Sequence, residues 1–236
     1  LYGRNNILEI VKATAEKIFI PLTVAGGLRS IDDMRKMLLA GADKIAINTA
    51  AVKQPSIISE GARMFGSQCV VLSIEAKRVS AGKYEAYTDN GRERTGLDVF
   101  EWAKQAVDLG AGEILVTAVD REGTGTGFDI ELLSKISKMV NVPVIGCGGA
   151  GSKEDFLEAI VSGCADAVSA ASVFHYNLMK VNDGVFRSNP FSNTDDLKAR
   201  LSGGSGAFGK IKTFSISELK KFLGERIADR EFALHL

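Results

Sequence analysis

The chain alternates short apolar runs with amphipathic stretches of about ten to fifteen residues. The apolar runs are rich in Val, Ile and Leu on both faces, which is typical of parallel strands that are covered by helices. Several amphipathic stretches begin at a helix-capping residue, namely Ser30, Ser152 or Ser215. The expected strands are 19–25, 44–48, 69–75, 113–119, 142–147 and 166–171, and the expected helices are 5–17, 31–40, 54–64, 98–109, 129–139, 152–162 and 215–224.

An internal repeat narrows the fold class. Residues 20–52 and 142–173 both contain a strand, a Gly-Gly turn, a Ser-capped acidic helix, a turn that ends in Ala, and a second strand. Repeated βα units of this kind predict an α/β fold of the (β/α)8 type, a TIM barrel whose halves are related. A doubly wound parallel sheet is the alternative.

The number of strands sets the expected domain organisation. The pattern contains six strands and opens on a helix, whereas a closed barrel of this type has eight strands. We therefore expect one barrel domain over residues 1–236, N-terminally incomplete and lacking its first two strands. Residues 176–213 are polar and rich in turn residues, so we expect an insertion there. It is either a mobile surface segment or a cover for the face where the strands end.

Charge and composition exclude several classes of function. The 29 basic and 29 acidic residues cancel, so no overall field attracts nucleic acid or an anionic membrane. No apolar run approaches the roughly 18 residues of a membrane-spanning helix, and the N-terminus lacks a signal-peptide layout. The three cysteines have apolar neighbours, and both histidines lie far from any cysteine pair or acidic cluster, so we expect a cytoplasmic protein with no metal site and no cofactor.

The two Gly-Gly turns are candidate anion sites. Each follows a strand and leads toward a helix N-terminus, where backbone N–H groups and the helix dipole favour a negative charge. Small polar residues after the next strand supply the second half of each anion site. The repeat therefore predicts two matched sites for a long ligand with a phosphate at each end. The alternative is that glycine only permits a tight turn. The candidate residues are Gly26, Gly27, Asn48 and Thr49 in one repeat, and Gly148, Gly149 and Ser172 in the other.

Three acids fall at or just beyond predicted strand ends. Glu75 ends the run CVVLSIE, and Asp120 and Glu122 open a loop rich in Gly and Thr. In a barrel, the ends of the strands deliver side chains to the catalytic face, so these acids are candidates for proton transfer or ligand binding. The alternative is that they are ion-pair partners of neighbouring cations. Those cations are Lys77, Arg78 and Arg121.

Two further charges lie at the opposite ends of strands. Lys44 and Glu113 each immediately precede a predicted strand, which places them on the floor of a barrel. Charges that enter a floor need partners, so an interlocking charged ring is one interpretation. Stability is the usual role of residues on this face.

Several long motifs, in the same order, resemble the cyclase subunit of imidazole glycerol phosphate synthase. They are GGLRS, AGADKIAINTAAV, FGSQCVVLSIEAKR, GAGEILVTAVDREGTGTGFD, VPVIGCGGAGS and ADAVSAASVFH. The resemblance implies a (β/α)8 barrel that binds an elongated bisphosphate ribotide. It also implies ammonia from a HisH-type glutaminase docked beneath the barrel, and imidazole glycerol phosphate and an aminoimidazole carboxamide ribotide as products.

The resemblance also implies roles for matching positions. Of the catalytic pair, one acid lies on the first strand, before residue 1, and the other corresponds to Glu75, where the family's motif has aspartate. Lys44 and Glu113 correspond to a charged gate at the ammonia entrance. Phosphate would be held by Gly27, Asn48 and Thr49 at one end and by Gly123, Gly148, Gly149 and Ser172 at the other, and Thr117 and Gln68 would line the cavity.

Two other functions remain as alternatives. Divergent relatives of this subunit resemble partners that deliver ammonia during the amidation of surface-sugar precursors, where the barrel is more a conduit than a catalyst. The second alternative is a single-chain bisphosphate isomerase from a related barrel, and the motifs AINTAAV and SQCVVLSIEAKR argue against it.

Overall fold

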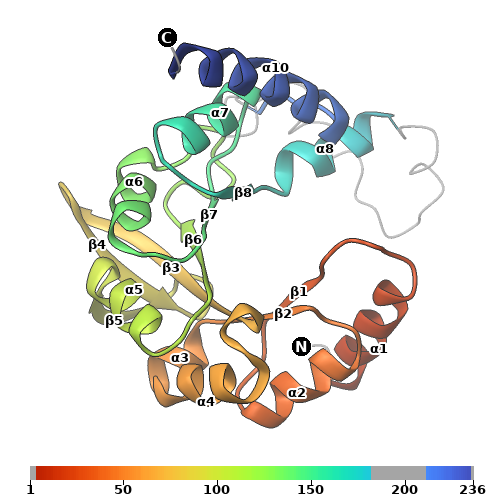
Figure 1. Cartoon of the computed structure of the whole chain (residues 1–236), viewed down its shortest axis with the longest axis vertical. Helices are drawn as coiled ribbons and strands as arrows, with labels where there is room; N and C mark the ends of the chain where they lie inside the picture. Colours follow the sequence, from red (N-terminus) through yellow and green to blue (C-terminus); the bar gives the residue numbers. More distant parts are fainter. Residues whose placement is uncertain (1–3, 182–210, 235–236) are drawn as a thin grey trace. The chain divides into compact units, whose positions relative to one another are not determined.

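The computed structural model describes residues 4–181 and 211–234. Six strands follow one another along the sheet in the order in which they occur in the chain, with helices between them (Figure 1). This sequential order is that of a (β/α)8 barrel, as predicted, whereas a doubly wound sheet reverses its strand order. The six strands are β1 (Thr23–Ala25), β2 (Lys44–Ile47), β3 (Val70–Ser80), β6 (Glu113–Ala118), β7 (Val144–Cys147) and β8 (Ala167–Ser169).

The strands run in parallel. β1 pairs with β2, and β2 with β3, in parallel registers. Just before β6, the N–H of Gly112 donates to the C=O of Val70 at the start of β3, at 3.0 Å. The N–H of Ile114 at the start of β6 donates to the C=O of Pro143, just before β7, at 2.9 Å. These bonds align the beginnings of neighbouring strands, so their carboxyl ends also lie along one edge.

Seven predicted helices are present, with ends within a few residues of expectation except at the last, which is longer. Ser30 caps its helix by accepting a hydrogen bond from the N–H of Asp33, and Ser215 and Glu218 exchange hydrogen bonds as a capping box. The short α3 (Thr49–Lys53), the 3-10 turn η1 (Ser67–Cys69) and α8 (Ser172–Val181) were not predicted. The predicted helices are α1 (Arg4–Ala15), α2 (Ile31–Leu39), α4 (Ser56–Phe65), α5 (Val99–Asp108), α6 (Ile130–Met139), α7 (Lys153–Val161) and α10 (Ile216–Leu234).

A long β-hairpin was also missed. β3 does not end at residue 75 but continues to Ser80, and β4 (Lys83–Thr88) and β5 (Glu93–Asp98) extend the sheet with antiparallel pairing. The prediction ended β3 too early because its second half, KRVS, is polar. Polar residues are tolerated there because that half is paired with a hairpin and is not buried on both faces.

The described residues form two compact units. Unit 1 contains the residues up to Thr117 together with Lys135–Ile145, and unit 2 contains Ala118–Ser134 together with the residues from Gly146 onward. In unit 1, β-strand side chains such as Ile45, Leu72 and Ile114 are at most 1% exposed. Burial of each such side chain stabilises the unit by about 1.5–3 kcal/mol relative to exposure.

Aromatic residues form the centre of unit 2. Phe156 of α7 packs edge-to-face against Phe128 and Phe214, with ring centroids 5.5 and 5.8 Å apart. Phe174 of α8 packs against Phe214 at 5.8 Å. Such pairs contribute about 0.5–1.5 kcal/mol each beyond area burial, so the cluster fixes α7, α8 and the segment before α10.

The first residues of the predicted insertion at 176–213 are helical. Residues 176–181 belong to α8, because the apolar residues of SVFHYNLMKV recur at helical spacing. Residues 182–210 lie outside the described residues. After them, the N–H of Lys212 donates to the C=O of Gly151 at 2.7 Å.

An ion pair in the hairpin makes stability depend on pH. Glu85 is buried, and its carboxylate accepts hydrogen bonds from the guanidinium of Arg94, with a shortest contact of 2.6 Å, and from the N–H of Gly96 at 3.0 Å. The hydrogen bond from Arg94, followed by that from Gly96, lowers the pKa of Glu85. This stabilisation is therefore present above the glutamate pKa of the unfolded chain, about 4.3, and is lost as the pH falls through it toward the lower folded-state pKa.

We expect Glu85→Gln to reduce the loss of stability between about pH 5 and pH 3. Urea unfolding at a series of pH values measures it, with Glu93→Gln on the neighbouring strand as the exposed control. Parallel pH profiles for the protein and Glu85→Gln would contradict this assignment.

Candidate active site

Glu75 lies in the middle of β3, where the strand exchanges one partner for another. The parallel register with β2 ends at Leu72, and Glu75 is paired with Tyr87 of β4 in the antiparallel part. The sequence predicted Glu75 as the last residue of its strand, and the structure shows that β3 continues beyond it. The parallel pairing of β3 with β2, however, ends before Glu75. Its side chain is partly buried.

The carboxylate of Glu75 is held by backbone rather than by a cation. Its Oε2 accepts a hydrogen bond from the N–H of Gly91, at 2.8 Å. Lys77 instead lies over the ring of Tyr87, 5.4 Å from its centroid, and the guanidinium of Arg78 lies over the ring of Tyr84. Within the described residues Glu75 forms no ion pair. Neither Lys77 nor Arg78, the candidate cations on β3, is therefore its partner.

The first Gly-Gly turn lies in unit 1. Gly26 and Gly27 have φ values of +93° and +72°, a conformation that side chains rarely adopt, and no atom lies within 4 Å of a Cβ built on either. Ala25 is paired with Ala46, so the residues after β1 and β2 share the carboxyl edge of the sheet. At that edge the side-chain amide of Asn48 donates to the C=O of Tyr87 at 3.1 Å, and Thr49 opens α3.

The second Gly-Gly turn lies in unit 2 and is crowded. Gly148 and Gly149 have φ values of +93° and +105°, and a Cβ on Gly149 would lie 2.1 Å from the carbonyl oxygen of Gly127. Glycine is therefore required here by close backbone approach as well as by φ. Gly123, at φ +72°, has open space around its Cβ position, and Ser172 begins α8.

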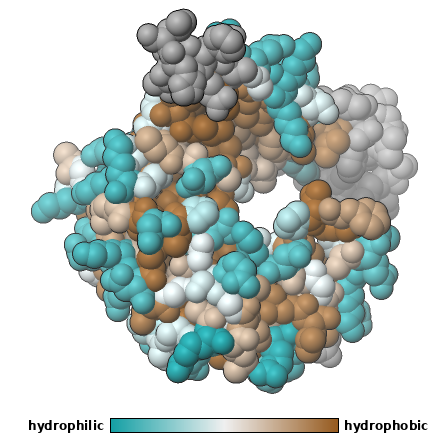
Figure 2. Space-filling model, viewed as in Figure 1, coloured by the Kyte–Doolittle hydropathy of each residue, from teal (hydrophilic) through white to brown (hydrophobic). Residues whose placement is uncertain are grey.

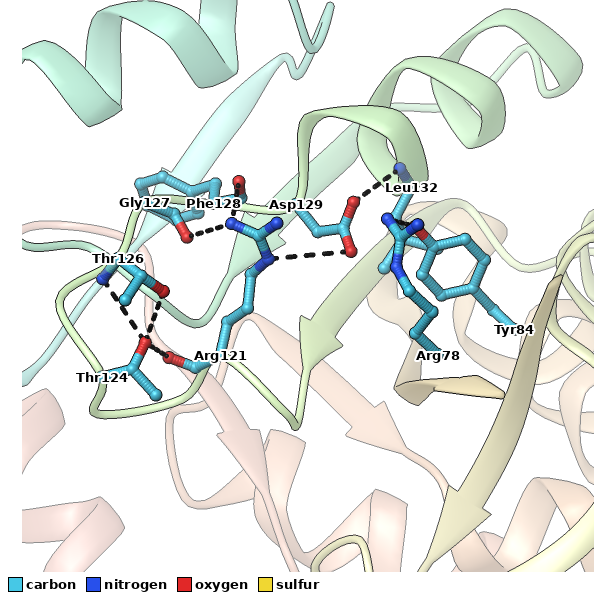
Figure 3. A network of polar contacts seen from close by, with 9 residues as sticks. All are labelled: Arg78, Tyr84, Arg121, Thr124, Thr126, Gly127, Phe128, Asp129 and Leu132. Atoms are coloured by element: carbon cyan, nitrogen blue, oxygen red, sulfur yellow. Dashed lines mark hydrogen bonds and ion pairs between the residues drawn. The ribbon is translucent and has the colours of Figure 1, made fainter. Parts of the chain in front are cut away.

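The loop between β6 and α6 is held by Arg121 (Figure 3). Its guanidinium donates to the carbonyl oxygens of Gly127 and Phe128, each at 3.2 Å, and lies 3.8 Å from the carboxylate of Asp129. Thr124 donates to the C=O of Arg121 at 2.6 Å. Arg121 therefore pairs with Asp129, which is 2% exposed, and not with the acids beside it.

Asp120 and Glu122 remain open to solvent. Both are exposed and form no ion pair with the described residues. Asp120 lies two residues beyond Ala118, the last residue of β6, as the sequence predicted. Their position leaves them available to a ligand at this loop.

Lys44 and Glu113 form an ion pair at the opposite edge of the sheet. Nζ of Lys44 lies 2.7 Å from Oε2 of Glu113, and the two side chains are 33% and 13% exposed. They are the first residues of β2 and β6, which lie on either side of β3. Both charges therefore lie at the beginnings of their strands, where each is the partner of the other.

We expect Lys44→Met to lower the free energy of unfolding by about 1–3 kcal/mol, because it leaves the partly buried carboxylate of Glu113 without its partner. Urea unfolding measures it. The control is Lys36→Met, which removes an exposed pair with Asp32 at 3.4 Å and is expected to change stability by less than about 1 kcal/mol. An equal loss of unfolding free energy in the two variants would show that the Lys44–Glu113 pair stabilises the protein no more than an exposed pair does.

Gln68 and Thr117, the two residues expected to line the cavity, lie at different levels of the sheet. Gln68 is in η1, before β3, and its amide donates to the C=O of Phe65 at 3.4 Å. It therefore lies toward the Lys44 edge, and the structure does not bring it together with Glu75. Thr117 is partly buried on β6, two and four residues beyond Leu115 and Glu113, with which it shares a face.

Two residues near Glu75 were missed by sequence reasoning. Tyr87 contacts Lys77 and Asn48, and Gly91 contacts Glu75. Their signal was the turn Asp89-Asn90-Gly91 between alternating polar and apolar residues, a strong indicator of a hairpin.

An apolar surface lies before the first two strands of unit 1. A cavity of about 350 Å³ is lined by residues 18–22, Ala15, Gly41 and Asp43. Phe19 is fully exposed and Ile20 is 71% exposed. On the face that Figure 2 draws, hydrophobic surface is interspersed with hydrophilic surface.

Among residues 4–181 and 211–234, no group of His, Cys, Asp and Glu is arranged to hold a metal ion. In the same ranges, no helix has both the length and the apolar character needed to cross a membrane.

A family model and several known proteins match this chain over most of its length. A family model described as histidine biosynthesis protein matches residues 1–180. Three similar relatives are each named imidazole glycerol phosphate synthase subunit HisF. That of Legionella pneumophila is 62% identical over 156 residues, which is 66% of this chain and 74% of the relative. Those of Alkaliphilus metalliredigens and Hydrogenobaculum sp. are 53% and 52% identical, over 74% and 75% of this chain and 69% and 71% of the relatives.

Both kinds of match extend over most of the described strands and helices. The family model spans every strand of the sheet and the β4–β5 hairpin. At identities above half and coverage above two thirds of each relative, the chain belongs to the HisF family of histidine biosynthesis proteins.

Proposed function

We propose that the chain acts as the cyclase subunit of imidazole glycerol phosphate synthase. In this reaction ammonia converts the bisphosphate ribulosyl-formimino ribotide into imidazole glycerol phosphate and aminoimidazole carboxamide ribotide. The observation that carries the proposal is the name shared by three relatives at 52–62% identity. The geometry around Glu75 is compatible with it, because an acid without a cationic partner in the described residues stands beyond the parallel part of β3.

In this proposal Glu75 transfers a proton during ring closure. A general acid or base must lie within hydrogen-bond reach of the proton that it moves. Oε2 is occupied by the N–H of Gly91, and Oε1 accepts no hydrogen bond within the described part of the chain. Glu75 therefore has one carboxylate oxygen fixed and the other available to the substrate.

The glycine turns hold the phosphates of the substrate in this proposal. Gly26, Gly27, Asn48 and Thr49 bind one phosphate. The open space at Gly27 supports this role, because a phosphate can approach the backbone where there is no Cβ. Gly123, Gly148, Gly149 and Ser172 bind the other, and Gln68, Thr117, Asp120 and Glu122 are the remaining candidates for substrate contact.

Ammonia comes from a glutaminase partner and passes the Lys44–Glu113 pair. The pair lies at the beginnings of β2 and β6, at the edge of the sheet away from Glu75. A 2.7 Å ion pair leaves no room for a molecule between its charged groups, so we propose that it opens for ammonia to enter.

Reconstitution with the glutaminase subunit of the histidine pathway tests the proposal. Full-length protein, that glutaminase, glutamine and the bisphosphate ribotide are combined, and the two products are measured by chromatography. The proposal predicts glutamine-dependent formation of imidazole glycerol phosphate. Glutamine hydrolysis without this product would favour the alternative function, an ammonia conduit for the amidation of surface-sugar precursors.

A further inference from the structure

We propose that the turn of the β4–β5 hairpin positions Glu75 through the backbone N–H of Gly91, and that this turn fits a glutamate at position 75. The functional part of this inference rests on the proposed cyclase activity, while the structural contact can be tested without it. Gly91 is a positioning residue here, because it acts through the carboxylate of Glu75 and not on the substrate.

The turn has a defined conformation. It connects Thr88 of β4 to Glu93 of β5, and Asp89, Asn90 and Gly91 have φ values of +53°, +58° and +72°. Asn, Asp and Gly are the residues that adopt this conformation at least cost. The N–H of Arg92 donates to the C=O of Thr88 at 3.1 Å and closes the turn, so the direction of the Gly91 N–H is fixed.

The body of the hairpin is anchored independently of Glu75. Glu85 of β4 accepts hydrogen bonds from Arg94 and from the N–H of Gly96, both of β5. The hydroxyl of Thr95 donates to the C=O of Ala86 at 2.5 Å. These contacts hold β4 and β5 in register, so the turn delivers its N–H to a fixed place.

The length of the side chain at position 75 decides whether the contact forms. The Gly91 N to Glu75 Oε2 distance is 2.8 Å. An aspartate is shorter by one C–C bond, about 1.5 Å. The same N···O distance would then stretch to about 4 Å, beyond hydrogen-bond range. Aspartate, the residue of the family motif at this position, cannot make this contact from the same backbone.

The hairpin also contacts a candidate phosphate ligand. The C=O of Tyr87, which is paired with Glu75 across the two strands, accepts a hydrogen bond from the side-chain amide of Asn48 at 3.1 Å. The hairpin therefore contacts Glu75 through its turn and Asn48 through β4. A disturbed turn releases Glu75 but leaves the bond to Asn48, so it is expected to affect turnover more than substrate binding.

The first experiment measures the contact by NMR. The amide proton of Gly91 is followed over a pH titration in the full-length protein and in Glu75→Gln and Glu75→Asp. We expect this proton to move downfield as Glu75 ionises, to stop responding in Glu75→Gln, and to respond at most weakly in Glu75→Asp. A Gly91 proton that does not respond in the unmodified protein, or responds equally in Glu75→Gln, would overturn the inference.

The second experiment measures the consequence for turnover. A β-branched residue cannot adopt the φ of Gly91 without strain, so Gly91→Val displaces the N–H. The control is Gly82→Val, at the β3–β4 turn with φ +67°, which imposes the same strain away from Glu75. We expect Gly91→Val alone to lower kcat about tenfold to hundredfold, with KM changed less than about threefold. Gly91→Val with unchanged kcat and a lost NMR response would refute the positioning role. If no variant and no unmodified protein turns over, the cyclase proposal fails while the NMR result still decides the contact.

Discussion

Glu75→Gln is expected to lower ammonium-dependent turnover by about 10²- to 10⁴-fold, the usual contribution of a general acid or base. The amide keeps the shape of the side chain and still accepts the hydrogen bond from the N–H of Gly91, but it cannot exchange a proton in the working pH range. KM for the bisphosphate is expected to stay within about threefold, because the proposed phosphate contacts are made by other residues.

The measurement is the initial rate of product formation at saturating ammonium, with kcat and KM determined separately. Glu93→Gln is the matched control, since it makes the same substitution at an exposed position of β5. Glu75→Asp is expected to fall between the two, because it keeps the acid but loses the reach to Gly91. A Glu75→Gln enzyme with at least a third of the original kcat would exclude Glu75 as the proton-transfer group.

Gly149→Ala is expected to destabilise the protein by about 2–5 kcal/mol, the sum of a left-handed backbone and an overpacked contact. The new Cβ would lie 2.1 Å from the carbonyl oxygen of Gly127, whose own N–H donates to the C=O of Gly149 at 2.8 Å. Because backbone atoms crowd the site, relief requires a shift of the loop that carries Gly127.

Gly27→Ala supplies the comparison, since Gly27 occupies the corresponding place in the other repeat. It has φ +72° but no atom within 4 Å of the Cβ position, so only the backbone term applies, about 1–2 kcal/mol. Chemical unfolding of both variants measures the difference. Equal destabilisation would contradict the crowded geometry at Gly149. It would show that both glycines are needed only for the left-handed backbone conformation of their turns.

The sequence was sufficient for the parts of the fold that depend on local pattern. Apolar runs with buried faces predicted the six strands β1, β2, β3, β6, β7 and β8, and serines followed by acids predicted the helix starts at Ser30 and Ser215. The position of Lys44 and Glu113 at the starts of their strands was enough to place both at one edge of the sheet. Parallel strands align their beginnings, so charges at those beginnings become neighbours.

The parts that depend on tertiary context could not be predicted. β3 exchanges β2 for β4 as its partner, and nothing in the polar residues after Glu75 separates a continued strand from a loop. Arg121 lies next to two acids in the sequence but pairs with Asp129, because the loop folds back between them. The contact from Gly91 to Glu75 joins residues 16 positions apart, and only the hairpin register fixes it.

We expect this chain to carry out ring closure itself and not only to conduct ammonia to another enzyme. Direct supply of ammonium removes the need for a glutaminase, so full-length protein is incubated with ammonium and the bisphosphate ribotide, and imidazole glycerol phosphate is measured over time. The expected result is steady product formation that depends on ammonium and falls at least about hundredfold in Glu75→Gln. Substrate binding without product, at ammonium concentrations that saturate the relatives in the same assay, would rule out ring closure by this chain.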